Sequence, residues 1–114
     1  MGDAKTDLLQ GTLDLIVLRL LRGGPANGWD ITQSIQVVSK GALEINYGSV
    51  YPALRRLEAR GFVKAEWGVS DNNRRAKFYR LTPAGRRHLR AETSSWTRYA
   101  EAVRKVLHAD EQPA

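Results

Sequence analysis

The side chains of this sequence that are best suited to chemistry are guanidinium, hydroxyl and amide groups gathered near its centre. Residues 46–90 hold 11 of the 18 Lys and Arg residues but 3 of the 12 Asp and Glu residues, a net charge of +8, whereas the rest of the chain carries −2. Clustered cations suit a polyanion, because each neutralised phosphate releases counterions. A solvated basic surface would give the same count, so charge alone leaves both interpretations open.

Two groups of side chains in this basic segment are of the kinds that contact nucleic acids. One group lies on a predicted helix, off the apolar face made by Val50, Leu54 and Leu57, and the other surrounds a predicted hairpin turn. Hydroxyl and guanidinium groups can meet phosphates or base edges, and a basic hairpin can follow phosphates or enter the minor groove. The predicted DNA contacts are Tyr47, Ser49, Tyr51, Arg55, Arg56, Asn72, Asn73, Arg74, Arg75 and Lys77.

These contacts have plainer alternatives. Arg55 and Arg56 are adjacent, so they point about 100° apart on a helix and cannot both face one base. We expect one of them to contact phosphate and the other to be solvated. For Tyr51 we expect a packed ring with its hydroxyl on phosphate. The alternative for residues 72–77 is a merely exposed hairpin tip.

Several classes of function are disfavoured. The chain has no cysteine, which excludes disulfides, thiol nucleophiles and cysteine-based metal sites. No glycine-rich phosphate loop, Gly-x-Ser-x-Gly or His-Glu-x-x-His motif occurs, so neither an enzyme nor a cofactor is expected. His88 and His108 lie twenty residues apart without a carboxylate cluster and are predicted to be solvated. Without a signal or membrane-spanning pattern, we expect a cytoplasmic protein with no membrane contact.

Three helices are predicted to position the first group of side chains. The first covers residues 6–22 and ends at Gly23-Gly24-Pro25, and its inward face consists of Leu13, Ile16, Val17, Leu20 and Leu21. The second is capped by Asn27 and turns inward Ile31, Ile35 and Val38. The third opens near residues 46–49 and reaches Arg60, where Gly61 ends it. Ser49 as its cap would place Pro52 in the first turn, where a missing N–H costs little.

After Gly61 the apolar period changes from helical to two. Residues 63–69 alternate as a half-buried strand, residues 70–73 are turn formers, and residues 75–81 return as a second strand. Trp67 is predicted to lie in the core of this sheet. Thr82 followed by Pro83 then predicts the start of a long last helix that continues to about His108.

Surplus apolar residues predict a partner chain. The first helix carries apolar groups outside its core face, at Leu8, Leu9, Leu15 and Leu18. In the last helix, Leu89, Trp96 and Val103 recur every seven residues. A small core leaves such faces to be covered by another subunit. The predicted dimer interface comprises Leu8, Leu9, Leu15, Leu89, Trp96, Val103 and Leu107. Trp96 can instead stack on a planar aromatic effector, although packing in the interface is the favoured interpretation.

The order of these elements predicts a mainly α, α+β winged helix. It has a three-helix helix-turn-helix core and a two-stranded β wing at residues 6–82, followed by a long C-terminal dimerisation helix at residues 83–108. In such folds the third helix enters the major groove and the wing lies along neighbouring backbone.

At these residues the sequence resembles the PadR-type transcriptional regulators, especially compact members with a single C-terminal helix. The resemblance covers residues 8–107 and rests on four segments: Gln10-Gly-Thr-Leu-Asp14, Gly28-Trp-Asp-Ile31, Gly48-Ser-Val-Tyr-Pro-Ala-Leu-Arg-Arg-Leu-Glu58 and Tyr79-Arg-Leu-Thr-Pro-Ala-Gly85. Trp29 departs from the Tyr that is common in the family.

The resemblance implies a homodimeric repressor that binds double-stranded DNA and that, in some members, is released by a small molecule. It also implies that the last helix pairs across the two-fold axis with the first helix of the partner. The alternative function is a winged-helix module that binds a protein or RNA without recognising an operator, because a fold does not determine its function.

Overall fold

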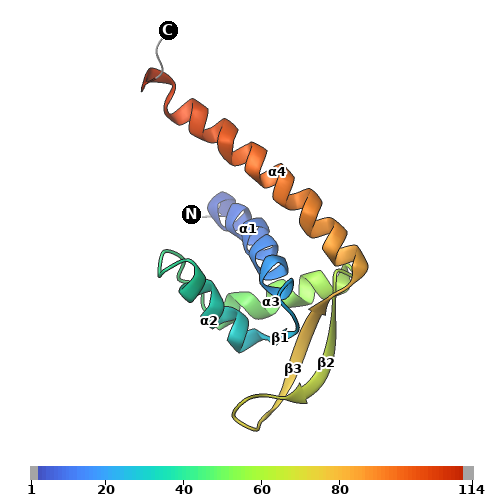
Figure 1. Cartoon of the computed structure of the whole chain (residues 1–114). Coiled ribbons are helices and arrows are strands. Elements are labelled where there is room, and N and C mark those ends of the chain that lie inside the picture. The colour runs from blue at the N-terminus through green and yellow to red at the C-terminus, as the bar shows by residue number, and fades with distance from the viewer. Residues whose placement is uncertain (1–2, 112–114) are drawn as a thin grey trace.

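The computed structural model describes the backbone of residues 3–111 and the side chains of residues 11–110. Its elements are α1 (Asp3–Leu21), β1 (Ala26–Asn27), α2 (Gly28–Val38), α3 (Tyr47–Ala59), β2 (Val63–Val69), β3 (Arg75–Leu81), α4 (Pro83–Leu107) and the 3-10 turn η1 (Ala109–Glu111). Helices α1, α2 and α3 pack together beside the sheet, and α4 runs away from them (Figure 1). The predicted winged-helix fold is confirmed. No helix within residues 3–111 is long and apolar enough to cross a membrane.

The sheet has three antiparallel strands in the order β1-β3-β2, one more than the sequence predicts. The hairpin pairs Val63 with Leu81 at its base and Val69 with Arg75 near its turn, as the alternating pattern predicts. The extra strand β1 pairs Ala26 with Tyr79. Two residues are too few for any alternation to be recognised, yet this strand ties the start of α2 to the base of the wing.

The core lies where α1, α2, α3 and the base of the hairpin meet. Its buried members are Leu13, Val17, Leu18, Leu21, Ile31, Ile35, Val50, Ala53, Leu54, Leu57, Val63, Tyr79, Leu81 and Leu89. Two expectations need correction. Leu18 is buried, although its position had suggested an outer face, and Val38 is 71% exposed because α2 buries residues only in its first turns, up to Ile35.

The wing extends beyond this core, which corrects a second set of expectations. Val63 and Ala65 pack against the core at the base of β2, but Trp67 is 60% exposed and Val69 is exposed as well. Trp67 is therefore not a residue of the sheet core, and its ring lies beneath the exposed Arg75 side chain instead of against the core. The alternation that predicts the strand is correct, but its burial ends halfway.

Helix α4 begins as predicted and then leaves the body of the protein. The Thr82 hydroxyl accepts a hydrogen bond from the Gly85 backbone at 3.0 Å and donates one to the Gly61 carbonyl at 2.7 Å. Gly85 lies so close to Phe62 that a Cβ would overlap its carbonyl. His88 stacks on the Phe62 ring at a centroid distance of 4.1 Å, so it is packed rather than solvated as predicted. Beyond these contacts and Leu89, α4 has no buried residue.

Candidate nucleic-acid interface

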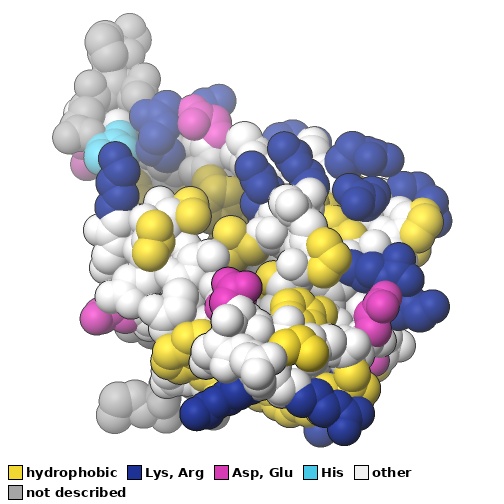
Figure 2. All heavy atoms as spheres, turned by 60° about the horizontal axis from the view of Figure 1, so that its bottom comes forward, with side chains coloured by type: hydrophobic (Ala, Val, Ile, Leu, Met, Phe, Trp, Pro, Cys, Tyr) yellow, Lys and Arg dark blue, Asp and Glu magenta, His cyan; other side chains and the backbone are white. Residues whose placement is uncertain are grey.

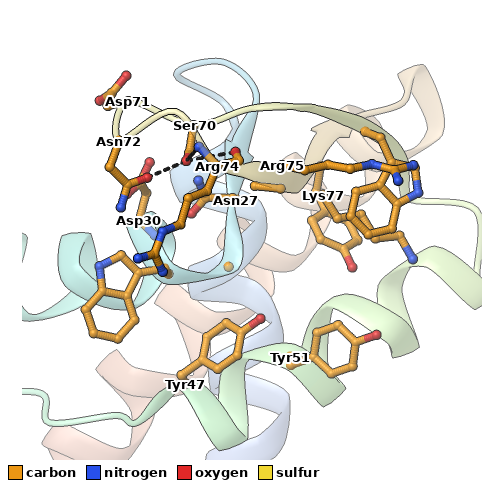
Figure 3. A pocket seen from close by; sticks show the side chains of 15 residues that line it. Asn27, Asp30, Tyr47, Tyr51, Ser70, Asp71, Asn72, Arg74, Arg75 and Lys77 are labelled. Carbon is orange, nitrogen blue, oxygen red and sulfur yellow. Dashed lines mark hydrogen bonds between the residues drawn. The ribbon is translucent and has the colours of Figure 1, made fainter.

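An open groove of about 730 Å³ separates the wing from the amino ends of α2 and α3. It brings together most of the residues predicted to contact DNA: Tyr47, Tyr51, Asn72, Arg74, Arg75 and Lys77. Figure 3 shows Tyr47 and Tyr51 on the helix side, facing the hairpin residues across the groove. Ser49, Arg55 and Arg56 also belong to α3, and Asn73 belongs to the hairpin turn, but none of these four lines the groove.

The first turn of α3 starts at the early end of the predicted range of residues 46–49. Asn46 is the N-cap, and its side-chain oxygen accepts a hydrogen bond from the Ser49 backbone at 3.0 Å. Pro52 therefore lies inside the helix, where it cannot donate a hydrogen bond to the Gly48 carbonyl. The longer helix places Tyr47 and Tyr51 one turn apart, so that both rings face the groove with centroids 6.3 Å apart.

A glycine allows α3 to approach α2 closely at this point. A Cβ added at Gly28 would lie 2.7 Å from Cε1 of Tyr47, too close for any side chain unless the tyrosine moves. The Tyr47 ring therefore packs over the first residue of α2 and keeps part of its surface exposed. Asn27 caps α2 as predicted, because its side-chain oxygen accepts from the Asp30 backbone at 2.8 Å.

The two adjacent arginines of α3 have different environments. Arg56 makes two hydrogen bonds to the Asp14 carboxylate of α1, from Nη2 at 2.7 Å and from Nε at 3.3 Å. This ion pair is partly buried and joins residues 42 positions apart. Arg55 is exposed. Arg56 is thus held by a carboxylate within its own chain, an environment that neither alternative for the two arginines had predicted.

The hairpin turn is held by its own hydrogen bonds. The Ser70 backbone donates to the Arg74 carbonyl at 2.8 Å, and the Ser70 hydroxyl donates to the Asn72 side chain at 2.6 Å. Asn73 adopts φ = 60°, a left-handed conformation that asparagine tolerates better than most residues. Asn72 and Asn73 therefore shape the turn, while the exposed Arg74 and Arg75 extend from it.

Cations of the wing lie over aromatic rings. The Arg75 guanidinium lies 4.5 Å from the centroid of the Trp67 ring, and Lys77 Nζ lies 5.8 Å from that of Tyr79. Such contacts hold the cations in place while leaving their charge unneutralised. Figure 2 shows basic and hydrophobic side chains interleaved on this side of the molecule, with acidic ones few and separated.

Tyr79 forms the floor of the groove and is buried. Its hydroxyl has no hydrogen-bond partner among the described residues. Burial raises the pKa of Tyr79 to about 12, with smaller contributions from Tyr51 and Glu58, so the hydroxyl stays neutral at physiological pH.

The family model described as the transcriptional regulator PadR-like family matches residues 17–91, more than half of the chain. This chain belongs to the PadR-like family of transcriptional regulators.

Solved structures support this assignment. A transcriptional regulator from Clostridium thermocellum matches with a TM-score of 0.77 and 28% identity over 87% of this chain and 93% of its own. A PadR-family regulator from Eggerthella lenta matches with a TM-score of 0.73 and 32% identity over 93% of this chain and 90% of its own. PadR from Bacillus subtilis, solved in complex with operator DNA, matches with a TM-score of 0.64 and 27% identity over 71% of this chain and 46% of its own.

The residues predicted for a dimer interface divide into four groups in this PadR-like chain. Trp96 is 47% exposed and Val103 38%, and Leu107 is exposed further along the same helix. Leu89 is a correction: it is 3% exposed in the core of its own chain, so it has no surface for a partner. Leu15 is half-buried against that core. The side chains of Leu8 and Leu9 lie outside the described residues.

Sequence reasoning missed several residues at the interface of this PadR-like chain. Trp29 and Asp30 line the groove from the first turn of α2, and Asp14 holds Arg56 from α1. The signal for Trp29 was its place two residues after the predicted cap Asn27, outside the apolar spacing of Ile31 and Ile35. Asp14 gave none, because an acid on a helix is ordinarily solvated. Among the described residues, no cluster of His, Asp and Glu could hold a metal ion.

Proposed function

We propose that this PadR-like regulator binds duplex DNA as a homodimer and represses transcription. The observation that carries the proposal is the single groove in which aromatic hydroxyls of α3 face cations of the wing. Phosphate is the natural ligand for hydroxyl and guanidinium groups on opposite walls. The operator complex of Bacillus subtilis PadR supports the same use of the fold here.

In this proposal α3 enters the major groove and the wing follows the adjacent backbone. Tyr47, Ser49, Tyr51 and Arg55 are exposed on α3, and one of them or more reads base edges. Arg74, Arg75 and Lys77 hold phosphates from the wing. Arg56 takes no part, because Asp14 already holds it.

The proposed dimer uses the part of α4 beyond Leu89. Trp96, Val103 and Leu107 form one stripe, and the exposed Tyr99 and Val106 widen it on one side. At about 100° per residue, the Glu101–Arg104 ion pair lies on other faces of the helix. An exposed apolar stripe with a polar back is the pattern expected of a helix that pairs. The winged helix at residues 6–82 and the dimerisation helix at residues 83–108 would then act as one unit.

The test starts with purified protein and fragmented DNA from the source genome, from which bound fragments are selected and sequenced. A near-palindrome with half-sites about 34 Å apart is expected, because a two-fold dimer presents its helices to successive major grooves. Affinity for the selected duplex is then measured by fluorescence anisotropy. If roughly 6–10 phosphates are neutralised, affinity should fall about 10³-fold or more between 50 and 200 mM salt.

Two variants and a control assign the contacts. Arg55→Ala and Arg74→Ala should weaken binding of the selected duplex while leaving the dimer and its melting temperature intact. Arg87→Ala removes an equally exposed cation from α4, outside the groove, and should leave affinity within about twofold. A flat salt response, or equal losses in all three variants, would count against the interface.

The alternative function is an interaction module for protein or RNA. It predicts a monomer in solution, or equal affinity for the selected duplex and for either of its single strands. Measuring both strands beside the duplex therefore separates the two functions directly.

The proposal also includes release of the protein from DNA by a small aromatic effector. Trp96 supports it, because the dimer would bring an exposed indole from each chain to one seam. Adding a simple planar aromatic acid, benzoate, to the protein–DNA complex should lower anisotropy in the wild type but not in Trp96→Leu. If Trp96→Leu responds equally, the indole serves only as packing.

A further inference from the structure

A second cavity, of about 500 Å³ and open to solvent, lies between α1 and α4, and its polar lining residues are exposed. It is lined by four arginines, two hydroxyl residues and one leucine: Arg19, Arg22, Arg86, Arg90, Thr93, Ser94 and Leu89. The first two arginines stand at the carboxyl end of α1, and the other two are one turn apart on α4. Both helices thus bring a pair of guanidinium groups to one cavity.

The four guanidinium groups are not neutralised within the described part of the chain. The ion pairs found among residues 11–110 use Arg56, Arg80 and Arg104 and none of the cavity arginines. No carboxylate lines the cavity either. Like charges repel when they are brought together, so such a cluster is stabilised by an anion that lies between them.

This cavity is separate from the proposed DNA interface. Strand β3 leads from the wing turn at Arg75 to the start of α4, and its seven residues span about 20 Å. Figure 1 shows α4 beginning at the end of the hairpin opposite to its turn. No residue lines both the cavity and the groove. DNA held by α3 and the wing would therefore leave the cavity free.

We propose that this arginine cavity binds a small molecule that carries two oxyanion groups, as in a pyrophosphate or a dicarboxylate. A guanidinium fork binds a phosphate or carboxylate through two parallel hydrogen bonds, so two pairs of arginines suit two such groups. Thr93 and Ser94 add hydroxyl donors that can bind further oxygens of the ligand.

Binding there would connect the two helices that determine the shape of the proposed dimer. A ligand bridging Arg19 or Arg22 with Arg86 or Arg90 ties α1 to α4 and so sets the direction in which α4 leaves the body. In a dimer built on α4, that direction sets the spacing of the recognition helices. This regulatory step rests on the proposed function, whereas binding itself does not.

The test measures ligand binding without DNA. Pyrophosphate and succinate are titrated separately into the full chain by isothermal calorimetry at constant ionic strength, so that a phosphate and a dicarboxylate are distinguished. Saturable binding of one ligand per chain is expected. Arg19→Gln and Arg86→Gln should each weaken it by about tenfold, the loss expected for one charge-assisted pair of hydrogen bonds.

Two controls identify the site. Arg87→Gln changes the neighbouring exposed arginine that does not line the cavity, and Arg74→Gln removes a cation of the DNA groove. Both variants should bind the ligand with an affinity within about twofold of that of the wild type if the cavity is the site. Circular dichroism of each variant establishes that it is folded before it is titrated.

Absence of saturable binding by either probe overturns the proposal, and so does equal weakening in Arg86→Gln and Arg87→Gln, which would indicate general charge screening. Loss of ligand binding in Arg74→Gln alone would place the ligand in the DNA groove and would also overturn the proposal. The effect on DNA is measured last, as the change in duplex affinity with ligand present. Ligand binding without any duplex binding would reject the proposed function and keep the cavity site.

Discussion

The body of this protein, residues 11–89, and the extension of α4, residues 90–107, use apolar residues in opposite ways. In the body, Leu54 and its neighbours from three helices and the sheet are sealed from solvent. In the extension, Trp96 and Val103 follow the same helical spacing but face outward. Leu89 and Trp96 lie on one stripe, seven residues apart, and only Leu89 has a core to enter. Spacing alone therefore predicts a stripe but not what covers it.

The largest expected effect comes from truncating a buried side chain in the core of the body. Leu54→Ala removes a side chain that is 0% exposed and should lower the free energy of unfolding by about 2–5 kcal/mol, measured by urea denaturation at fixed protein concentration. Val37→Ala, at an exposed position of α2, should change it by less than about 0.5 kcal/mol. Similar losses in both variants would mean that the body has no dominant core.

The next effect concerns the extension. Trp96→Asp places two like charges on the proposed seam and should raise the dimer dissociation constant by about 100-fold or more, as measured by analytical ultracentrifugation. The folded body should persist, because Trp96 contributes nothing to its core. Loss of helicity in a monomer that no longer melts cooperatively would instead make the dimer a condition for folding.

A matched control changes charge on the opposite side of α4. Lys105 lies about 180° around the helix from Trp96, so Lys105→Asp should leave the dimer intact. If Lys105→Asp dissociates the dimer as strongly as Trp96→Asp, the seam lies elsewhere on α4.

A smaller effect compares two ion pairs. Asp14–Arg56 is partly buried between α1 and α3, whereas Glu66–Arg80 is more exposed on the hairpin. Double-mutant cycles with alanine should give a coupling of about 1 kcal/mol for the first pair and below about 0.5 kcal/mol for the second. Equal couplings would show that Asp14 does not anchor the recognition helix. Arg56→Lys should recover little of the coupling energy that Arg56→Ala loses, because an ammonium group cannot reproduce the two parallel hydrogen bonds.

The sequence predicts local features of this fold well and tertiary ones less well. The bounds of β2 and β3 and the caps Asn27 and Thr82 follow from alternation and from side chains that bond their own backbone, so short segments suffice. Leu89, Trp67 and Arg56 were misplaced because their environment depends on a distant element. For Arg56 that element begins 42 residues earlier at Asp14. Candidate DNA contacts could be found by residue type. The sequence could not show which of them would be bound by other residues of the same chain.

The smallest effect tests which end of the predicted range, Asn46 or Ser49, caps α3. Asn46 caps α3 through the Ser49 backbone, so Asn46→Ala should cost about 1 kcal/mol of folding free energy, whereas Ser49→Ala should cost about 0.5 kcal/mol or less. Both substitutions leave the apolar face of α3 unchanged, so urea denaturation compares the two hydrogen-bonding roles alone. A larger loss in Ser49→Ala would move the start of α3 toward Pro52. The turn that brings Tyr47 and Tyr51 to one groove would then no longer be helical.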